Sequence, residues 1–214
     1  MRLSPEEGRV IGSLVEKQLT TPQQYPLTVN ALLLACNQSS NRDPVVKYDE
    51  PTVHTALASL KAAGLVRFEH PAHGRSVTRY QQVLDEYLGL SVQQVALLAV
   101  LLLRGPQTAG ELRLRTERMC NFEGIGHVEA ELERLSSQTE PLVVRLARQP
   151  GQKEERWAEQ LTALAPQAPA PGLPAGGPPK VGDQGHLAAQ VAELRAQLRD
   201  LRDEVEELRR DLHG

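Results

Sequence analysis

The residue types that most often carry catalysis or bind metals are sparse in this 214-residue sequence. Its two cysteines, Cys36 and Cys120, lie far apart in the sequence, and His70 and His73 flank a predicted turn without a cysteine pair nearby. A structural zinc site needs four Cys or His ligands, usually supplied as two short-spaced pairs. Neither this pattern nor a glycine-rich phosphate loop, a G-x-S-x-G or an H-E-x-x-H motif occurs. We therefore predict a protein that is not an enzyme and uses no metal or cofactor.

Adjacent acidic and basic residues on the first predicted helix do not indicate catalysis either. Glu16 and Lys17 have the types of an acid/base pair, but neighbouring residues on a helix do not share a face. We expect both to be helix-surface charges.

Hydroxyl and basic side chains between residues 42 and 79 could instead contact nucleic acid. Arginine and lysine bind phosphate groups, and threonine hydroxyls bond to phosphates or base edges. Three of these hydroxyl or basic residues belong to a predicted helix at residues 51–63 and lie outside the apolar stripe that this helix is expected to bury. Five more are arginines or lysines in the loop before the helix and in the hairpin after it. The predicted nucleic-acid-binding residues are Arg42, Lys47, Thr52, Thr55, Lys61, Arg67, Arg75 and Arg79.

Other interpretations of these residues remain open. The helix at 51–63 has no Arg, Asn or Gln for a bidentate base contact, and charged hairpin edges also prevent edge-to-edge strand pairing. The corresponding helix later in the chain exposes acidic residues that would repel phosphates, among them Glu129, Glu131 and Glu133. A solvated face or a protein interface is the alternative for both helices.

Two similar segments must position these residues. Each opens with a helix whose start has capping-box spacing, at Ser4 and Glu7 and again at Ser91 and Gln94. A second helix is expected near Thr28 in one segment and near Thr108 in the other. The third helices share a buried stripe with i, i+4, i+7 spacing, formed by Val53, Leu57 and Leu60 and by Val128, Leu132 and Leu135.

A β-hairpin is predicted after each third helix. The first hairpin uses residues 65–68 and 77–83, and the second uses residues 142–146 and the strand around Trp157. Helix, helix, helix, hairpin is the order of a winged-helix domain, whose third helix is the recognition helix and whose hairpin is the wing. A duplicated hairpin in an unrelated α+β fold is the alternative. We predict a mainly α fold with small β-hairpins, with winged-helix domains at residues 1–86 and 87–164.

The last fifty residues have a different character. Residues 165–182 are rich in proline, glycine and alanine, which predicts a linker. Residues 183–214 alternate apolar spacings of four and three, which is typical of a two-stranded coiled coil and predicts a homodimer. Packing on a winged-helix domain or against another coil is the alternative. The predicted seam residues are Leu187, Val191, Leu194, Leu198, Leu201, Val205, Leu208 and Leu212.

Several ungapped motifs between residues 4 and 162 resemble the YceH-like family of bacterial proteins. They include residues 16–22, 25–28, 35–38, 40–42, 102–108, 110–113, 141–144 and 150–151. The resemblance implies a tandem winged-helix fold, often with a short helical tail. It implies no activity, since the family lacks an assigned biochemical function.

Charge and hydropathy restrict the class of protein further. The net charge is −3, so any DNA affinity must come from a local patch. No apolar run is long enough for a membrane span, no signal-peptide core is present, and two cysteines form no disulfide framework, so we expect a cytoplasmic protein. Two hypotheses remain: a dimeric DNA-binding regulator, favoured by the first hairpin and the coil, and a protein-interaction scaffold, favoured by the neutral charge.

Overall fold

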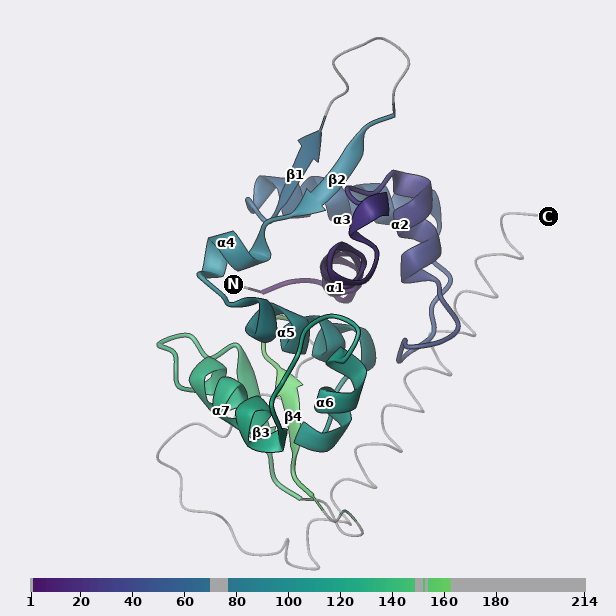
Figure 1. Ribbon diagram of the computed structural model, residues 1–214. Helices are drawn as coiled ribbons and strands as arrows, with labels where there is room; N and C mark the ends of the chain where they lie inside the picture. The colour runs from purple at the N-terminus through teal and green to yellow at the C-terminus, as the bar shows by residue number, and fades with distance from the viewer. Residues whose placement is uncertain (1, 70–76, 149–151, 153, 163–214) are drawn as a thin grey trace, which may run out of the picture. The chain divides into compact units, whose positions relative to one another are not determined.

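From Pro5 to Glu159 the chain alternates short helices with two β-hairpins (Figure 1). The computed structural model describes residues 2–69, 77–148, 152 and 154–162, which all lie within one compact unit, Met1–Ala168. The first half contains α1 (Pro5–Thr20), the 3-10 helix η1 (Pro22–Gln24), α2 (Val29–Cys36), α3 (Glu50–Ala62), β1 (Val66–Glu69), β2 (Arg79–Gln82) and α4 (Leu84–Leu88). The second half contains α5 (Val92–Arg104), α6 (Ala109–Thr116), α7 (Ile125–Ser136), β3 (Val143–Leu146) and β4 (Arg156–Glu159).

The predicted mixture of helices and two small antiparallel hairpins is confirmed. The predicted linker at 165–182, the coiled coil at 183–214 with its eight seam residues, and the predicted first hairpin turn lie outside the described residues. None of the helices in the described ranges is both long and apolar enough to cross a membrane.

The predicted helix starts are confirmed in atomic detail. The Ser4 hydroxyl accepts the Glu7 backbone N–H at 3.2 Å, while the Glu7 carboxylate accepts the Ser4 N–H at 2.7 Å. Ser91 and Gln94 form the same capping box at α5, and Thr108 caps α6 with a glutamate three residues on. Each box satisfies two backbone donors that a helix start leaves without intrahelical partners, so the polar sequence sets the helix register.

Each half buries the apolar stripe of its third helix against its first helix and its hairpin. The six stripe residues predicted from the sequence are all buried. Tyr80 on β2 and Trp157 on β4 close over the helices, exposing only 6% and 3% of their surfaces. Each aromatic residue also forms an antiparallel bridge with the segment before the second helix, at Leu27 in one half and Gln107 in the other. In both halves, therefore, the return strand of the hairpin is joined to the segment before the second helix at an equivalent position.

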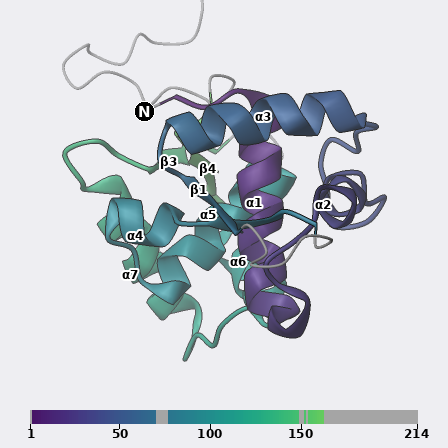
Figure 2. The same ribbon diagram turned by 90° about the horizontal axis from the view of Figure 1, so that it is seen from above.

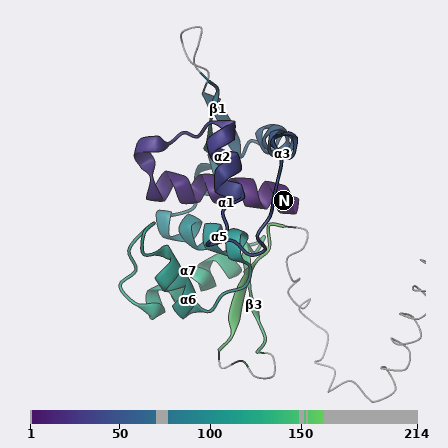
Figure 3. The ribbon, with the colours of Figure 1, turned by 90° about the vertical axis from the view of Figure 1, so that its right-hand side faces the viewer.

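The halves meet where α1 lies against α5 (Figure 1). Gly8 and Gly12 permit this close approach, because a Cβ on Gly12 would lie 3.1–3.2 Å from Leu102 and Leu103 atoms of α5. The first and last described segments of the unit are also joined, since the Leu3 N–H donates to the Leu161 carbonyl at 2.7 Å. The strands of the two hairpins extend toward opposite ends of the unit in Figures 1 and 3, and α3 crosses over α1 in Figure 2.

Two short elements were not predicted. The 3-10 helix η1 and the five-residue helix α4 are too short to give a helical hydrophobic period. Helix α4 has no side-chain cap at its start; Leu84 anchors it in the core, and Gly89 in the left-handed region (φ 65°) ends it. Helix α4 is therefore stabilised by tertiary packing and not by a local capping signal in the sequence.

Candidate nucleic-acid interface and an arginine-lined pocket

The outward face of α3 is formed by short side chains. Thr55, Ala58 and Ser59 are exposed, and beyond Glu50 at its start the helix contains no carboxylate. The Thr55 hydroxyl donates to the Pro51 carbonyl at 2.9 Å but remains exposed. Its accepting lone pairs are therefore available on the surface.

The Thr52 hydroxyl is not free, because Thr52 takes part in capping the start of α3. Its backbone N–H donates to Asp49 Oδ1 at 3.0 Å, and its hydroxyl donates to the same oxygen at 2.5 Å. These two hydrogen bonds favour the charged carboxylate and lower the Asp49 pKa. Thr52 therefore stabilises the start of α3 and is only partly exposed.

The predicted cations around α3 lie in different environments. Lys61 is exposed and lies over the Phe68 ring, 4.1 Å from its centroid, which joins the end of α3 to β1. Lys47 is exposed in the loop before α3. Arg67 is exposed and pairs with Glu86 at 2.7 Å, so its charge is already partly neutralised. Arg75 lies outside the described residues.

Arg79 has a structural partner that is repeated in the second half. Its guanidinium donates to the Pro26 carbonyl at 2.9 Å, and Arg156 donates to the Pro106 carbonyl at the same distance. Both bonds connect the return strand of a hairpin to the segment before the second helix. Arg79 is still exposed, so it has both this contact and access to solvent.

The prediction that Arg42 contacts nucleic acid is corrected by its burial. Its side chain is fully buried, and its guanidinium donates to both carboxylate oxygens of Glu16, at 3.1 and 2.5 Å. It also donates to the carbonyls of Ala35 and Asn41. The expectation that Glu16 is a surface charge is wrong for the same reason. This pair fixes the loop at residues 37–49 on α1.

The corresponding surface of the second half is acidic. Glu129 and Glu133 are exposed on α7, and Arg145 of β3 is paired with Glu133 at 2.7 Å and with Glu155 at 3.3 Å. Glu131, which the sequence pattern placed outward, is buried and accepts hydrogen bonds from Gln94 and Arg134. The arrangement opposes phosphate binding, as the sequence predicted.

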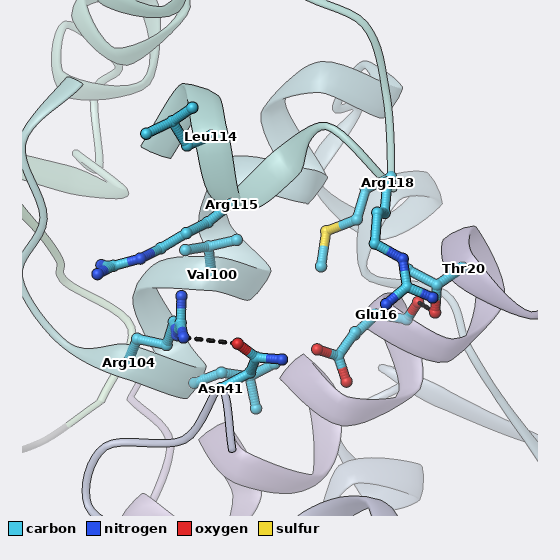
Figure 4. A pocket seen from close by; sticks show the side chains of 10 residues that line it. Glu16, Thr20, Asn41, Val100, Arg104, Leu114, Arg115 and Arg118 are labelled. Atoms are coloured by element: carbon cyan, nitrogen blue, oxygen red, sulfur yellow. Dashed lines mark hydrogen bonds between the residues drawn. The ribbon is translucent and has the colours of Figure 1, made fainter. Parts of the chain in front are cut away.

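A pocket of about 210 Å³ lies between the halves, where the ends of α1, α5 and α6 meet (Figure 4). Its polar lining includes Glu16, Asn41, Arg104, Arg115 and Arg118. Asn41 adopts a left-handed backbone conformation (φ 60°) and accepts a hydrogen bond from Arg104 at 2.6 Å. Side chains from both halves thus form one polar wall.

Comparisons with known proteins identify the family. A family model described as "Protein of unknown function, DUF480" matches residues 3–152. The chain belongs to this family. A UPF0502 protein of Koribacter versatilis is 47% identical over 193 residues, covering 90% of this chain and 89% of its own. One from Geotalea daltonii is 52% identical over 168 residues, covering 78% and 76% respectively.

Membership of the DUF480/UPF0502 family confirms the resemblance to YceH-like bacterial proteins. A UPF0502 protein of Dechloromonas aromatica is 46% identical over 204 residues and covers 91% of this chain, so the similarity extends past Thr162 into the C-terminal residues. These names describe family membership and no activity.

The pocket was missed at the sequence level in this UPF0502 protein. Its residues come from α1, the loop before α3, α5, α6 and the turn after α6. The fold brings residues 16–41 against residues 100–119, so no single motif spacing marks the pocket. A partial signal existed, because four arginines fall between residues 104 and 118: Arg104, Arg113, Arg115 and Arg118. Only the fold separates the three that line the pocket from Arg113, which does not.

Proposed function

We propose that each half is a winged-helix unit, that the chain is a binding protein without catalytic activity, and that its first half binds duplex DNA through α3. The order of α1, α2, α3, β1 and β2 supports the winged-helix assignment, and α5, α6, α7, β3 and β4 repeat it. In such a unit the exposed face of the third helix enters the major groove.

The character of the outward face of α3 carries this proposal. Its short, uncharged residues, Thr55, Ala58 and Ser59, let the helix backbone approach a groove closely, and no carboxylate follows Glu50. Lys61 adds a positive charge at the end of the same helix. On α7, the exposed Glu129 and Glu133 would face the phosphates instead, so DNA binding belongs to the first half.

Few positive charges are available for phosphate contact, so we expect DNA binding with a modest dependence on salt concentration. Lys47, Lys61, Arg67 and Arg79 are exposed. Arg67 shares its charge with Glu86, and Arg79 also donates to the Pro26 carbonyl. With roughly three phosphate contacts, the logarithm of the affinity should fall with the logarithm of salt concentration with a slope of about −3. The structure offers no arginine on α3 for a bidentate base contact, so recognition depends on the backbone and groove shape.

The experiment exploits the duplication of the fold. Counting from the matched valines Val53 and Val128, Ala58 corresponds to Glu133, so Ala58→Glu gives α3 an acidic residue that α7 already has. Fluorescence anisotropy of a labelled random duplex, at low ionic strength, should show binding that Ala58→Glu weakens at least about tenfold. Ala130→Glu, at an exposed position of α7, is the matched control and should change nothing.

Equal loss in both variants, or no binding by the unmodified chain at low salt, would refute the DNA proposal. Lys61→Ala offers a milder test, since removal of one phosphate contact should reduce the salt slope by about one.

Protein binding by the second half is the second candidate. A depression of about 550 Å³ lies between α6, α7 and the second hairpin, lined by residues that include Ile125, Glu129, Arg145 and Trp157. Ile125, which is 47% exposed, gives this largely charged depression an apolar edge that a protein partner could cover. Capture of a cellular protein that survives nuclease and is lost in Ile125→Asp, but not in Ala58→Glu, would favour this role.

We also propose a homodimer formed by residues 183–214, in a cytoplasmic protein. The eight predicted seam residues occupy heptad a and d positions, whose burial requires a partner helix. Light scattering of the full chain should give a dimer mass, and Leu194→Asp with Leu201→Asp should give the monomer. Ala196→Asp, at an f position, is the control; a monomer mass for the unmodified chain would exclude the dimer.

A further inference from the structure

The pocket between the halves collects positive charge from α5, α6 and the turn after α6. Arg104, Arg115 and Arg118 all line it (Figure 4). Val100, Leu103, Leu114 and Met119 form an apolar part of the lining, and Thr20 adds a hydroxyl from α1. The cavity therefore combines cations with a small apolar surface.

The described residues neutralise these cations only in part. Arg104 donates to the neutral side chain of Asn41. Arg115 approaches Glu111 no closer than 3.7 Å, and Glu111 is also bound to Arg156 at 3.0 Å and to the Thr108 N–H at 2.9 Å. Arg118 makes no hydrogen bond or ion pair with another described residue, and it is exposed.

Glu16, the one carboxylate among the described residues of the lining, is already engaged. Both oxygens of Glu16 accept from Arg42, whose side chain is fully buried behind the pocket wall. A bound anion would therefore meet the field of three guanidinium groups, while the charge of Glu16 is offset by Arg42. Burial and the nearby charges of Arg115 and Arg42 lower the Arg104 pKa, while Glu16 and Glu111 offset part of this effect.

We propose that this pocket binds a small organic oxyanion, a phosphate or a carboxylate with a short apolar group. Guanidinium groups bind both head groups through paired hydrogen bonds. The apolar group would lie on Val100, Leu114 and Met119. A volume of about 210 Å³ is below the usual range for drug-sized ligands, about 300–1,000 Å³, so the ligand is small.

Because the pocket lies between the two halves, a bound anion should also stabilise the unit against unfolding. Arg104, Arg115 and Arg118 belong to the second half, whereas Thr20 and Asn41 belong to the first. An anion held by both walls connects the halves beside the α1–α5 contact, so it should raise the unfolding temperature of the whole unit in proportion to its occupancy. This proposal does not depend on DNA binding by α3.

Isothermal titration calorimetry of the full chain at low ionic strength tests the proposal, with phenyl phosphate, benzoate and inorganic phosphate as probes. We expect phenyl phosphate or benzoate to bind saturably and more tightly than inorganic phosphate, because the apolar lining contributes. The stronger of the two identifies the head group. Arg115→Gln and Arg118→Gln should each weaken binding about tenfold, the loss typical of one charged hydrogen-bond partner.

Arg113→Gln is the matched control. Arg113 lies on the same helix and has the same charge but does not line the pocket, so its variant should bind as the unmodified chain does. Ala58→Glu should also bind normally, which separates this site from the DNA interface. No saturable binding of any probe, or equal weakening by Arg113→Gln, would overturn the proposal and leave only a diffuse basic surface.

Discussion

The first and second halves of this protein share a framework of polar contacts but differ in their outer surfaces. In both halves a Ser begins the first helix, a Thr begins the second, and an arginine of the return strand donates to a proline carbonyl before the second helix. A side chain at the end of each hairpin also accepts a backbone N–H two residues on, Gln82 from Leu84 and Glu159 from Leu161. These contacts position backbone, so they are retained in both copies.

The halves differ on the outward face of the third helix and in the segment that precedes it. The outward face of α3 has Thr55, Ala58 and Ser59, whereas that of α7 has Glu129 and Glu133. The segment between the second and third helices covers residues 37–49 in the first half and 117–124 in the second. The longer segment is held by a buried arginine, and it lines the pocket between the halves. The comparison indicates that the duplicated framework sets the fold, while the surfaces that diverged carry binding.

The largest expected effect comes from the Arg42–Glu16 ion pair, whose fully buried arginine has no counterpart among the described residues of the second half. Arg42→Ala leaves the largely buried Glu16 carboxylate with only the more distant Lys17 ammonium, at 3.7 Å, as an ion-pair partner, which should lower the free energy of unfolding by about 3 kcal/mol. Urea denaturation measures this loss. The double variant Arg42→Gln with Glu16→Gln should recover part of it, because no unpaired charge remains. A loss below about 1 kcal/mol would show that the pair is not structural.

The close contact between the halves gives the next largest effect. Gly12→Val places methyl groups against Leu102 and Leu103 of α5, where a Cβ alone is already tight, so it should cost about 1–3 kcal/mol. Gly126→Val on α7 is the control, because nothing lies within 4 Å of the added Cβ. Thermal unfolding of the two variants compares them directly. Equal stability would mean that the halves do not pack through this helix pair.

The duplicated arginine contacts should have smaller and similar effects on stability. Arg79→Ala and Arg156→Ala each remove a bond to a proline carbonyl at a partly solvated site, which should cost about 1 kcal/mol in urea denaturation. Only Arg79→Ala should also weaken duplex binding in the anisotropy assay, since only the first half is proposed to contact DNA. A duplex-binding loss in Arg156→Ala would contradict that asymmetry.

The smallest effect concerns the single cysteine of each half. Burial raises the pKa of both Cys36 and Cys120 to about 11. A raised pKa favours the thiol, so at pH 8 the thiolate fraction should be about 100-fold below that of a thiol of pKa 9, and the rate should rise with pH. Cys120, which is partly exposed, should react slowly with a thiol reagent, and the buried Cys36 only on unfolding. Fast labelling of Cys36 in the native protein would contradict its burial.

Much of the helical framework was predictable because its determinants are local. The capping boxes at Ser4 and Ser91 depend on residues three positions apart, and the buried stripes of α3 and α7 depend on spacings of three and four. The hairpins followed from short apolar runs with turn residues between them, and Tyr80 and Trp157 were correctly placed on their return strands. In each case the interacting residues are close in the sequence.

The sequence alone therefore determined the order of elements, the helix starts and the apolar stripes of this family member. The tertiary structure decided which charged residues are surface groups: it buried Arg42 with Glu16, turned Glu131 inward and brought Arg104, Arg115 and Arg118 around one pocket. The physical reason is that the cost of burying a charge depends on partners that the fold supplies from distant segments. Composition and spacing show that a charge is present, and only the packing of α1 against α5 shows what it faces.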